Sequence, residues 1–194
     1  MVKFDIILAS ASPRRKTILS QIGLEFITLP SNTLEDFSIN LPPEAFCEHW
    51  AREKTKDVAK NHPNTFIIGA DTIVVLDGEI LGKPKDRDHS VFMLKSLSGK
   101  THEVLTGVSF FHLESGTDIT FNESTFVSFN TLKDKDIDSY IDTYKPFDKA
   151  GSYGIQDGFS IHINKITGCF YNVMGLPISK FYKNFELLKK EINN

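Results

Sequence analysis

The stretch Gly69-Ala-Asp-Thr-Ile-Val-Val-Leu-Asp-Gly-Glu-Ile-Leu-Gly-Lys-Pro-Lys-Asp86 decides how this chain folds. The apolar run Phe66 to Ile68 just before it predicts a buried strand, and Ile73 to Leu76 predict a second one. Asp77-Gly78 is typical of a two-residue hairpin turn into a third strand. We therefore expect Asp71 at the end of a core strand.

The position of Asp71 between glycines, with Lys83 and Lys85 further along, allows two interpretations. A carboxylate at a strand end beside lysines suits a metal ion held against an anionic substrate. The alternative is an exposed turn with solvated charges, and this stretch considered alone favours the alternative. The remaining motifs of the chain reverse that preference.

The composition describes a globular protein of 194 residues, 40% of them apolar and 24% charged, which suffices for one or two compact lobes. A net charge of −3 argues against broad binding to nucleic acid or to an anionic membrane, because both need an excess of Lys and Arg. Cys47 and Cys169 are too few for a disulfide framework and lack metal-ligand spacing. We therefore expect a protein of the reducing cytoplasm.

The N-terminal segment predicts a buried strand over residues 4–9 that runs directly into a helix. Ser12 is suited to cap that helix, and Pro13 fits its first position. The free N–H groups of the first turn, with Arg14 and Arg15 beside them, would form an anion site. Adjacent arginines are more often solvated, but their place directly after a buried strand favours the anion site.

Periodicity and turn residues predict the other elements. Helices are expected over residues 13–22, 44–61, 87–96, 134–144 and 177–191, and strands over residues 25–29 and 159–166. Two long strands between Thr101 and Phe129, joined across Glu114-Ser-Gly-Thr117, indicate a curved antiparallel platform. The glycine-rich segment from Lys145 to Gln156 is typical of a loop that contacts a ligand or a partner.

Several common catalytic signatures are excluded. Ser98-Gly-Lys-Thr101 imitates the end of a Walker A loop, but Leu94 stands where that loop needs glycine. The six histidines form no ligand pair and no Ser/His/Asp grouping, so we expect them to be single surface or half-buried residues. Nothing near either cysteine indicates a lowered thiol pKa.

Seven motifs together cover most of the chain: Leu8-Ala-Ser-Ala-Ser-Pro-Arg-Arg15, Ala51-Arg-Glu-Lys54, Gly69-Ala-Asp-Thr72, Gly82-Lys-Pro84, Leu97-Ser-Gly-Lys-Thr-His102, Asp148-Lys-Ala-Gly-Ser-Tyr-Gly-Ile-Gln156 and Asn172-Val-Met-Gly-Leu-Pro177. In content and order they resemble the Maf family of nucleoside triphosphate pyrophosphatases, relatives of the house-cleaning inosine triphosphatases. The resemblance implies an α/β fold, with an elongated two-lobed mixed sheet, flanking helices and a central cleft, over residues 1–194 as a single domain. It also implies a homodimer and hydrolysis of a nucleoside triphosphate to the monophosphate and pyrophosphate.

The charges suit that chemistry. A triphosphate needs cations and backbone donors, for which the candidates are Arg14, Arg15, Lys54 and Lys83 together with the helix start. Glu35 and Asp71 are oxygen ligands suited to Mg²⁺ or Mn²⁺. By resemblance, Asp71 matches the catalytic base of the family, and its phosphate and metal residues match Ser10, Glu35, Lys54 and Lys83.

The base is expected to be a pyrimidine. A glutamine amide can donate to a carbonyl oxygen and accept from an imide N–H, which uracil and thymine present side by side, although a flipped amide also pairs with adenine or cytosine edges. In the family, the residues corresponding to Gln156, Arg14 and Thr72 accompany dTTP and UTP activity. The resemblance therefore implies dTTP and UTP as best substrates, with CTP or modified pyrimidine nucleotides as further candidates. Asp157 stands where the family commonly has glycine, which bears on the shape and charge of this loop.

A second hypothesis has a different class of function. Maf-like proteins are also linked to septum and division control, so the chain could be a nucleotide-binding regulatory protein with little turnover. Because no residue of the proposed site is missing, the sequence favours the enzyme.

Overall fold

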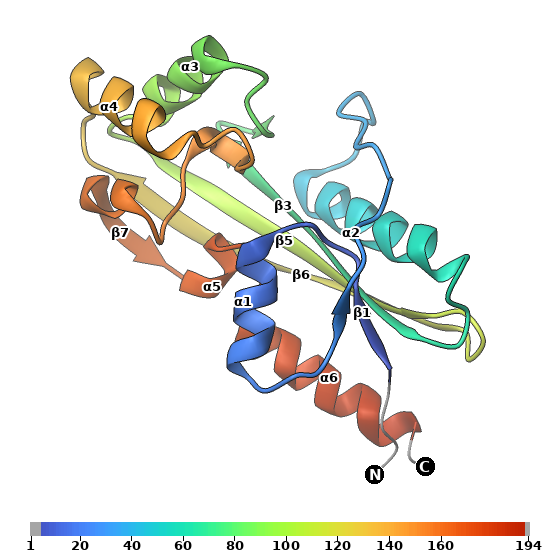
Figure 1. Ribbon diagram of the computed structural model, residues 1–194. Coiled ribbons are helices and arrows are strands. Elements are labelled where there is room, and N and C mark those ends of the chain that lie inside the picture. Colours follow the sequence, from blue (N-terminus) through green and yellow to red (C-terminus); the bar gives the residue numbers. More distant parts are fainter. Residues whose placement is uncertain (1–4, 193–194) are drawn as a thin grey trace. The chain divides into compact units, whose positions relative to one another are not determined.

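The computed structural model describes residues 5–192 and has an α/β fold (Figure 1). Along the chain its elements are β1 (Ile6–Leu8), α1 (Pro13–Gln21), β2 (Ile27–Thr28), α2 (Pro43–Ala59), β3 (Phe66–Leu76), β4 (Glu79–Leu81), α3 (Arg87–Leu97), β5 (Thr101–His112), β6 (Thr117–Phe129), α4 (Asp134–Tyr144), the 3-10 helices η1 (Ala150–Ser152) and η2 (Gly158–His162), β7 (Ile163–Thr167), α5 (Phe170–Val173) and α6 (Ile178–Ile192). Within residues 5–192, none of the helices combines the length and the apolar character needed to cross a membrane.

The strands form one mixed sheet in the order β2-β1-β3-β5-β6-β7, with β4 paired to β3 outside this path. Strand β1 is parallel to both of its neighbours, so that Ile7 lies opposite Ile27 and Ile67. Strand β4 runs antiparallel to β3, and β7 runs antiparallel to β6. The mixed sheet with flanking helices that the sequence predicts is confirmed.

Strand β3 corrects the position expected for Asp71. Residues 66–76 form one continuous strand, so Asp71 lies inside a strand and not at the end of one. A Cβ atom added at Gly69 would lie 2.5 Å from Thr55 Cγ2 and 2.6 Å from Ala51 O. This glycine therefore marks the place where α2 packs against the strand, which is a common reason for glycine within a strand.

Other boundaries differ from those predicted. Strands β1 and β2 are shorter than expected, and Phe4 lies outside the described residues. Ile22, the last residue of the first predicted helix, is the C-cap of α1 and is 37% exposed. The strand predicted over residues 159–166 is wrong in its first half, because Asp157 accepts from Phe159 N at 3.0 Å and begins η2 instead.

Local turn and cap chemistry is confirmed elsewhere. Asp77 and Gly78 have φ values of 52° and 87°, as a tight hairpin turn between β3 and β4 requires. Ser12 caps α1 through its side chain, and Pro13 is the first helical residue. The α4 helix begins and ends where the sequence predicts.

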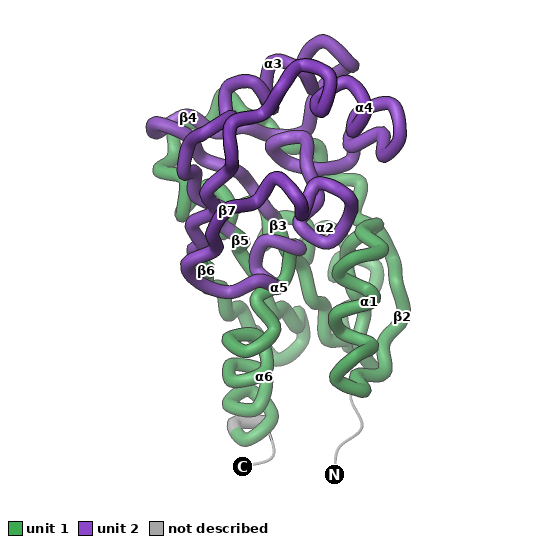
Figure 2. Tube along the Cα trace, turned by 90° about the vertical axis from the view of Figure 1, so that its left-hand side faces the viewer, with its two compact units in different colours: residues 1–71, 106–123, 175–194 green, residues 72–105, 124–174 purple. Residues whose placement is uncertain are grey.

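The chain divides into two compact units (Figure 2). Unit 1 comprises residues 1–71, 106–123 and 175–194, and unit 2 comprises residues 72–105 and 124–174. In unit 1, apolar residues of β1 and β3 pack against the end of α2, among them Ile7, Ile67 and Val58. The core of unit 2 is rich in aromatic side chains, including Phe129, Tyr153 and Phe159. A single domain with a central cleft stays a prediction.

Candidate active site

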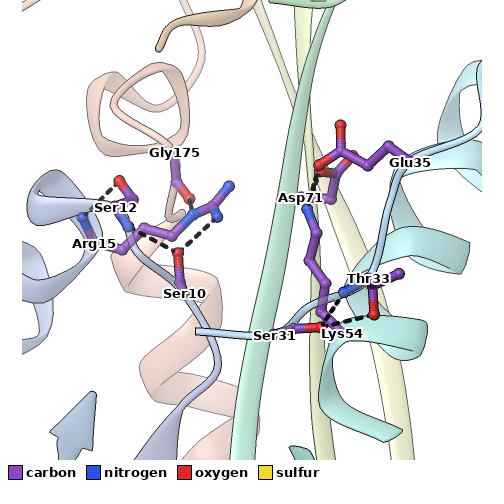
Figure 3. Close-up of polar contacts among 9 residues, drawn as sticks. All are labelled: Ser10, Ser12, Arg15, Ser31, Thr33, Glu35, Lys54, Asp71 and Gly175. Carbon is purple, nitrogen blue, oxygen red and sulfur yellow. Dashed lines mark hydrogen bonds and ion pairs between the residues drawn. The ribbon is translucent and has the colours of Figure 1, made fainter. Parts of the chain in front are cut away.

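The turn from β1 into α1 holds a serine and an arginine together (Figure 3). Ser10 Oγ accepts from Ser12 N at 3.2 Å and from Arg15 Nη1 at 3.1 Å. Arg15 Nε donates to Gly175 O at 2.8 Å, which fixes the guanidinium from a second side. Only 9% of Arg15 is exposed, and burial lowers its pKa from the ordinary value. Arg15 is thus not a solvated surface arginine, whereas Arg14 is half-buried.

A lysine and two carboxylates form a largely enclosed charged cluster in unit 1 (Figure 3). Lys54 Nζ, from α2, donates to Glu35 Oε1 at 2.6 Å and to Asp71 Oδ1 at 2.7 Å. The side chains are 13%, 17% and 5% exposed, respectively. Removing one member would leave a buried charge uncompensated, so the three groups act as a unit.

Burial and charge act in opposite directions on Asp71. Burial raises the pKa of its carboxyl group above the ordinary value, and the neighbouring Lys54 charge acts in the opposite direction. Its Oδ2 atom is buried and has no hydrogen-bond partner among the described residues. A buried carboxylate oxygen in this state is costly unless a water, a cation or a ligand meets it.

The loop that carries Glu35 is fastened to the helix that carries Lys54. Asp57 Oδ2 accepts from Ser31 Oγ at 3.0 Å and from Asn32 N at 2.9 Å. The bond from Asn32 N and the Ser31 hydroxyl lower the pKa of Asp57. Because residues three apart share a helix face, Asp57 holds the loop on the side where Lys54 meets Glu35.

Two glycines let α2 approach the sheet closely. Gly69 of β3 leaves no room for a Cβ atom, as described above, and one added at Gly107 of β5 would overlap the backbone of Cys47. Alternate residues of a strand share a face, so Asp71 lies on the α2 side of β3 together with Gly69. This close packing brings Lys54 within hydrogen-bond distance of Asp71.

The two carboxylates fit a hard divalent cation. No group of three or more His, Cys, Asp or Glu side chains within residues 5–192 could hold a metal ion by itself. Glu35 and Asp71 nevertheless offer carboxylate oxygens, one of which is the unpartnered Asp71 Oδ2. Mg²⁺ is commonly held by one or two carboxylates while substrate phosphates and waters complete its shell.

Thr72, Lys83 and Gln156, the remaining predicted site residues, belong to unit 2. Thr72 is half-buried in β3 and points to the face opposite Asp71. Lys83 is exposed. The carbonyl oxygen of its neighbour Gly82 accepts a hydrogen bond from Gly151 N at 3.1 Å. Gln156 is exposed in the loop that follows η1.

The histidine prediction is wrong for His102. This residue is 2% exposed, because it lies in the aromatic core of unit 2, where Nε2 and the Tyr153 hydroxyl are 2.8 Å apart. Burial lowers the pKa of His102 to about 4. Cys47 is buried and its thiol pKa is raised, chiefly by burial, so it is not an activated nucleophile.

Sequence reasoning missed the contributions of Asp57 and Gly69. Glycine within an apolar strand pattern signals a close approach of another backbone, and that signal was available at Gly69. For Asp57, the only signal in the sequence was its position three residues after Lys54. That spacing does not show that a distant loop forms hydrogen bonds with its carboxylate.

A lysine that bridges the carboxylates of Glu35 and Asp71, in a unit that also holds a serine and an arginine at a helix start, is an arrangement suited to binding phosphate groups. The family model described as Maf-like protein matches residues 5–188, and the chain belongs to this family. The resemblance seen in the motifs is thereby confirmed.

Curated relatives match almost the whole chain. A dTTP/UTP pyrophosphatase of Bacillus pumilus is 45% identical over 182 residues, covering 94% of this chain and 95% of the relative. One of Ruminiclostridium cellulolyticum is 43% identical over 189 residues, covering 97% and 98%. Among solved structures, a HAM1 protein from Coxiella burnetii has a TM-score of 0.49 and 14% identity, over 66% of this chain and 73% of its own. That last similarity is too low to support an inference about the site.

Proposed function

We propose that this chain is a nucleoside triphosphate pyrophosphatase that hydrolyses dTTP and UTP to the monophosphate and pyrophosphate. The observation that carries the proposal is the buried Asp71, whose Oδ1 is bound by Lys54 while Oδ2 lacks a partner within the described part of the chain. The names of the relatives agree with this activity.

The cations of unit 1 suit the triphosphate. Arg15 and Ser10 are already held in place, so the guanidinium charge and the hydroxyl are preorganised at the start of α1. Arg14 and the N–H groups at the start of α1 add further donors. Lys54 contributes a buried positive charge beside Asp71. Lys83 of unit 2 is assigned to phosphate only by its match to the family motif.

Asp71 is the general base of the proposed reaction. Its free Oδ2 accepts a proton from a water whose oxygen forms a bond to the α-phosphorus. The bond from that phosphorus to the bridging oxygen breaks, and pyrophosphate leaves. The charge of Lys54 opposes the rise in the pKa of Asp71 that burial causes, and so favours the ionised carboxylate that a general base requires.

Glu35 and Asp71 would hold the divalent cation, Mg²⁺ or Mn²⁺. When bound, this ion would polarise the phosphate oxygens and help to neutralise the triphosphate charge. The support comes from the donor set, two carboxylates of which one has an unpartnered buried oxygen.

Gln156, Thr72 and Arg14 are proposed to select the pyrimidine base, with Gln156 pairing with the adjacent carbonyl and imide groups. CTP is a candidate for weaker turnover, and purine triphosphates should be poor substrates. A cytoplasmic homodimer that removes unwanted nucleotides is the accompanying proposal, drawn from the family resemblance.

A panel of nucleoside triphosphates with Mg²⁺ tests the proposal, with pyrophosphate and phosphate measured separately. Pyrophosphate and monophosphate should appear together, fastest with dTTP and UTP. Stepwise release of single phosphates would contradict the assigned cleavage site. Tight nucleotide binding without turnover would instead support the regulatory protein.

A further inference from the structure

A closed set of hydrogen bonds surrounds the loop that carries Gln156. The Tyr140 hydroxyl donates to Asp157 Oδ2 at 3.2 Å and accepts from Gly154 N at 3.0 Å. The other oxygen of the same carboxylate, Asp157 Oδ1, accepts from Phe159 N at 3.0 Å. We call Tyr140, Gly154, Asp157 and Phe159 the loop clamp. It fastens the backbone on both sides of Gln156 to one side chain of α4.

The backbone between these ties forms a tight turn. Asp157 N donates to Gly154 O at 3.4 Å, so Ile155 and Gln156 are the two central residues of the turn. Ile155 is 3% exposed and anchors the turn in the core, while Gln156 is exposed. The direction in which Gln156 leaves the backbone is therefore fixed by the turn and by the clamp.

The clamp itself is rigidly supported. Tyr140 is 5% exposed, and its ring packs on Phe159 with centroids 4.8 Å apart and stacks on Tyr144 at 5.2 Å. Burial raises the pKa of Tyr140, so its hydroxyl stays protonated and can donate to the carboxylate. A Cβ atom at Gly154 would overlap the Asp157 carboxylate, so glycine is required there for the clamp to close.

We propose that Tyr140 and Asp157 are positioning residues for nucleobase selection, acting through the turn that presents Gln156. The inference rests on the proposed function, because it assumes that Gln156 meets the base. In this role the Asp157 carboxylate binds the protein's own groups, Tyr140 OH and Phe159 N, and does not itself select a purine.

Tyr140→Phe is the sharpest test, because it removes one hydroxyl and keeps the ring packing. One hydrogen bond is worth a factor of roughly 2 to 10, so the ratio of kcat/KM for dTTP to that for ATP should fall by about 3- to 10-fold. The loss should appear mainly in KM for dTTP, since the reacting phosphates are handled elsewhere. Asp157→Ala should lower the same ratio at least as far.

Tyr182→Phe is the control, because it removes the hydroxyl of an exposed tyrosine on α6, outside the clamp. It should leave the dTTP to ATP ratio unchanged. Hydrogen exchange of the amides in residues 150–160 provides a readout independent of activity. Exchange should be faster in Tyr140→Phe than in the wild type, and unchanged in Tyr182→Phe.

Two results would overturn the inference. One is an unchanged exchange rate in Tyr140→Phe, which would mean that the clamp does not hold the turn. The other is an unchanged preference: the wild type prefers dTTP and UTP, and the Tyr140→Phe variant prefers them to the same degree. A wild type that hydrolyses no nucleoside triphosphate would be a different result, since it would refute the proposed function itself.

Discussion

Lys54 Nζ lies 2.7 Å from Asp71 Oδ1, and the two residues are brought together by the packing of α2 on β3 at Gly69. The charge of Lys54 opposes the rise in the pKa of Asp71 that burial causes. The contact also depends on a close approach of α2 to the strand, for which a side chain at position 69 would leave no room. Glu35 reaches the same ammonium group from a loop fastened to α2 by Asp57. The reactivity of Asp71 therefore depends on residues that act by position as well as by charge.

Asp71→Asn should abolish most turnover while the protein still folds. The amide keeps the shape of the side chain but loses basicity and metal charge, and loss of a general base costs on the order of 10² to 10⁴ in rate. Steady-state kinetics and thermal unfolding check both parts. Asp77→Asn, in the exposed β3–β4 turn, is the control and should retain activity. Turnover of Asp71→Asn within a few-fold of wild type would remove Asp71 from the mechanism.

Lys54→Met should shift the acid limb of the pH–rate profile to higher pH. The Lys54 charge lowers the pKa of Asp71, so its removal raises that pKa and protonates the base at a pH where the wild type is still ionised. We expect this shift to higher pH besides a lower overall rate. Lys56→Met, which removes an exposed ion pair with Glu53 on the same helix, should leave the profile in place. An unshifted limb would separate Lys54 from the ionisation of Asp71.

Asp57→Ala should weaken Mg²⁺ binding more than it lowers the stability of the fold. The substitution releases Ser31 and Asn32, so the loop that presents Glu35 loses its tie to α2. The Mg²⁺ concentration for half-maximal activity should rise by about 3- to 10-fold, as expected for the loss of one or two hydrogen bonds. Asp57→Asn keeps one acceptor and should recover part of the effect. An identical Mg²⁺ titration for Asp57→Ala would show that Glu35 needs no such tie.

Gln156→Glu should reduce turnover of dTTP and UTP. A carboxylate has no donor for the base carbonyl, and an unmatched polar group costs roughly 1–3 kcal/mol. The ratio of kcat/KM values across the nucleotide panel measures the change. A native preference for guanine nucleotides would contradict the assigned role of Gln156.

The buried His102 should make folding stability depend on pH. Its pKa is lowered to about 4 in the folded protein, from 6.5. The stability it contributes is complete above pH 6.5 and is lost as the pH falls toward about 4, because only the unfolded chain gains a proton in that interval. The loss should approach about 3 kcal/mol. Denaturant unfolding at several pH values should show a shallower decline for His102→Gln, and equal slopes would refute the assignment.

The sequence by itself determined much of the local structure and the family. Turn chemistry at Asp77-Gly78 and capping at Ser12 depend on nearest neighbours, and both are found as predicted. The content and order of the motifs identified the Maf family, because both can be read from the sequence without knowledge of the fold. The candidate residues Ser10, Lys54 and Asp71 lie in those motifs, and Glu35, which lies outside them, was matched to the family's metal residues.

Only the tertiary structure decided how these residues are held and charged. Asp71 lies within a strand, not at its end, because residues 66–76 form one continuous strand that pairs with β1, β5 and β4. The burial of His102, the Asp57 tie and the clamp around Gln156 all join segments distant in sequence. Desolvation and long-range hydrogen bonds arise only when such segments meet, and local sequence patterns do not encode which distant groups will do so.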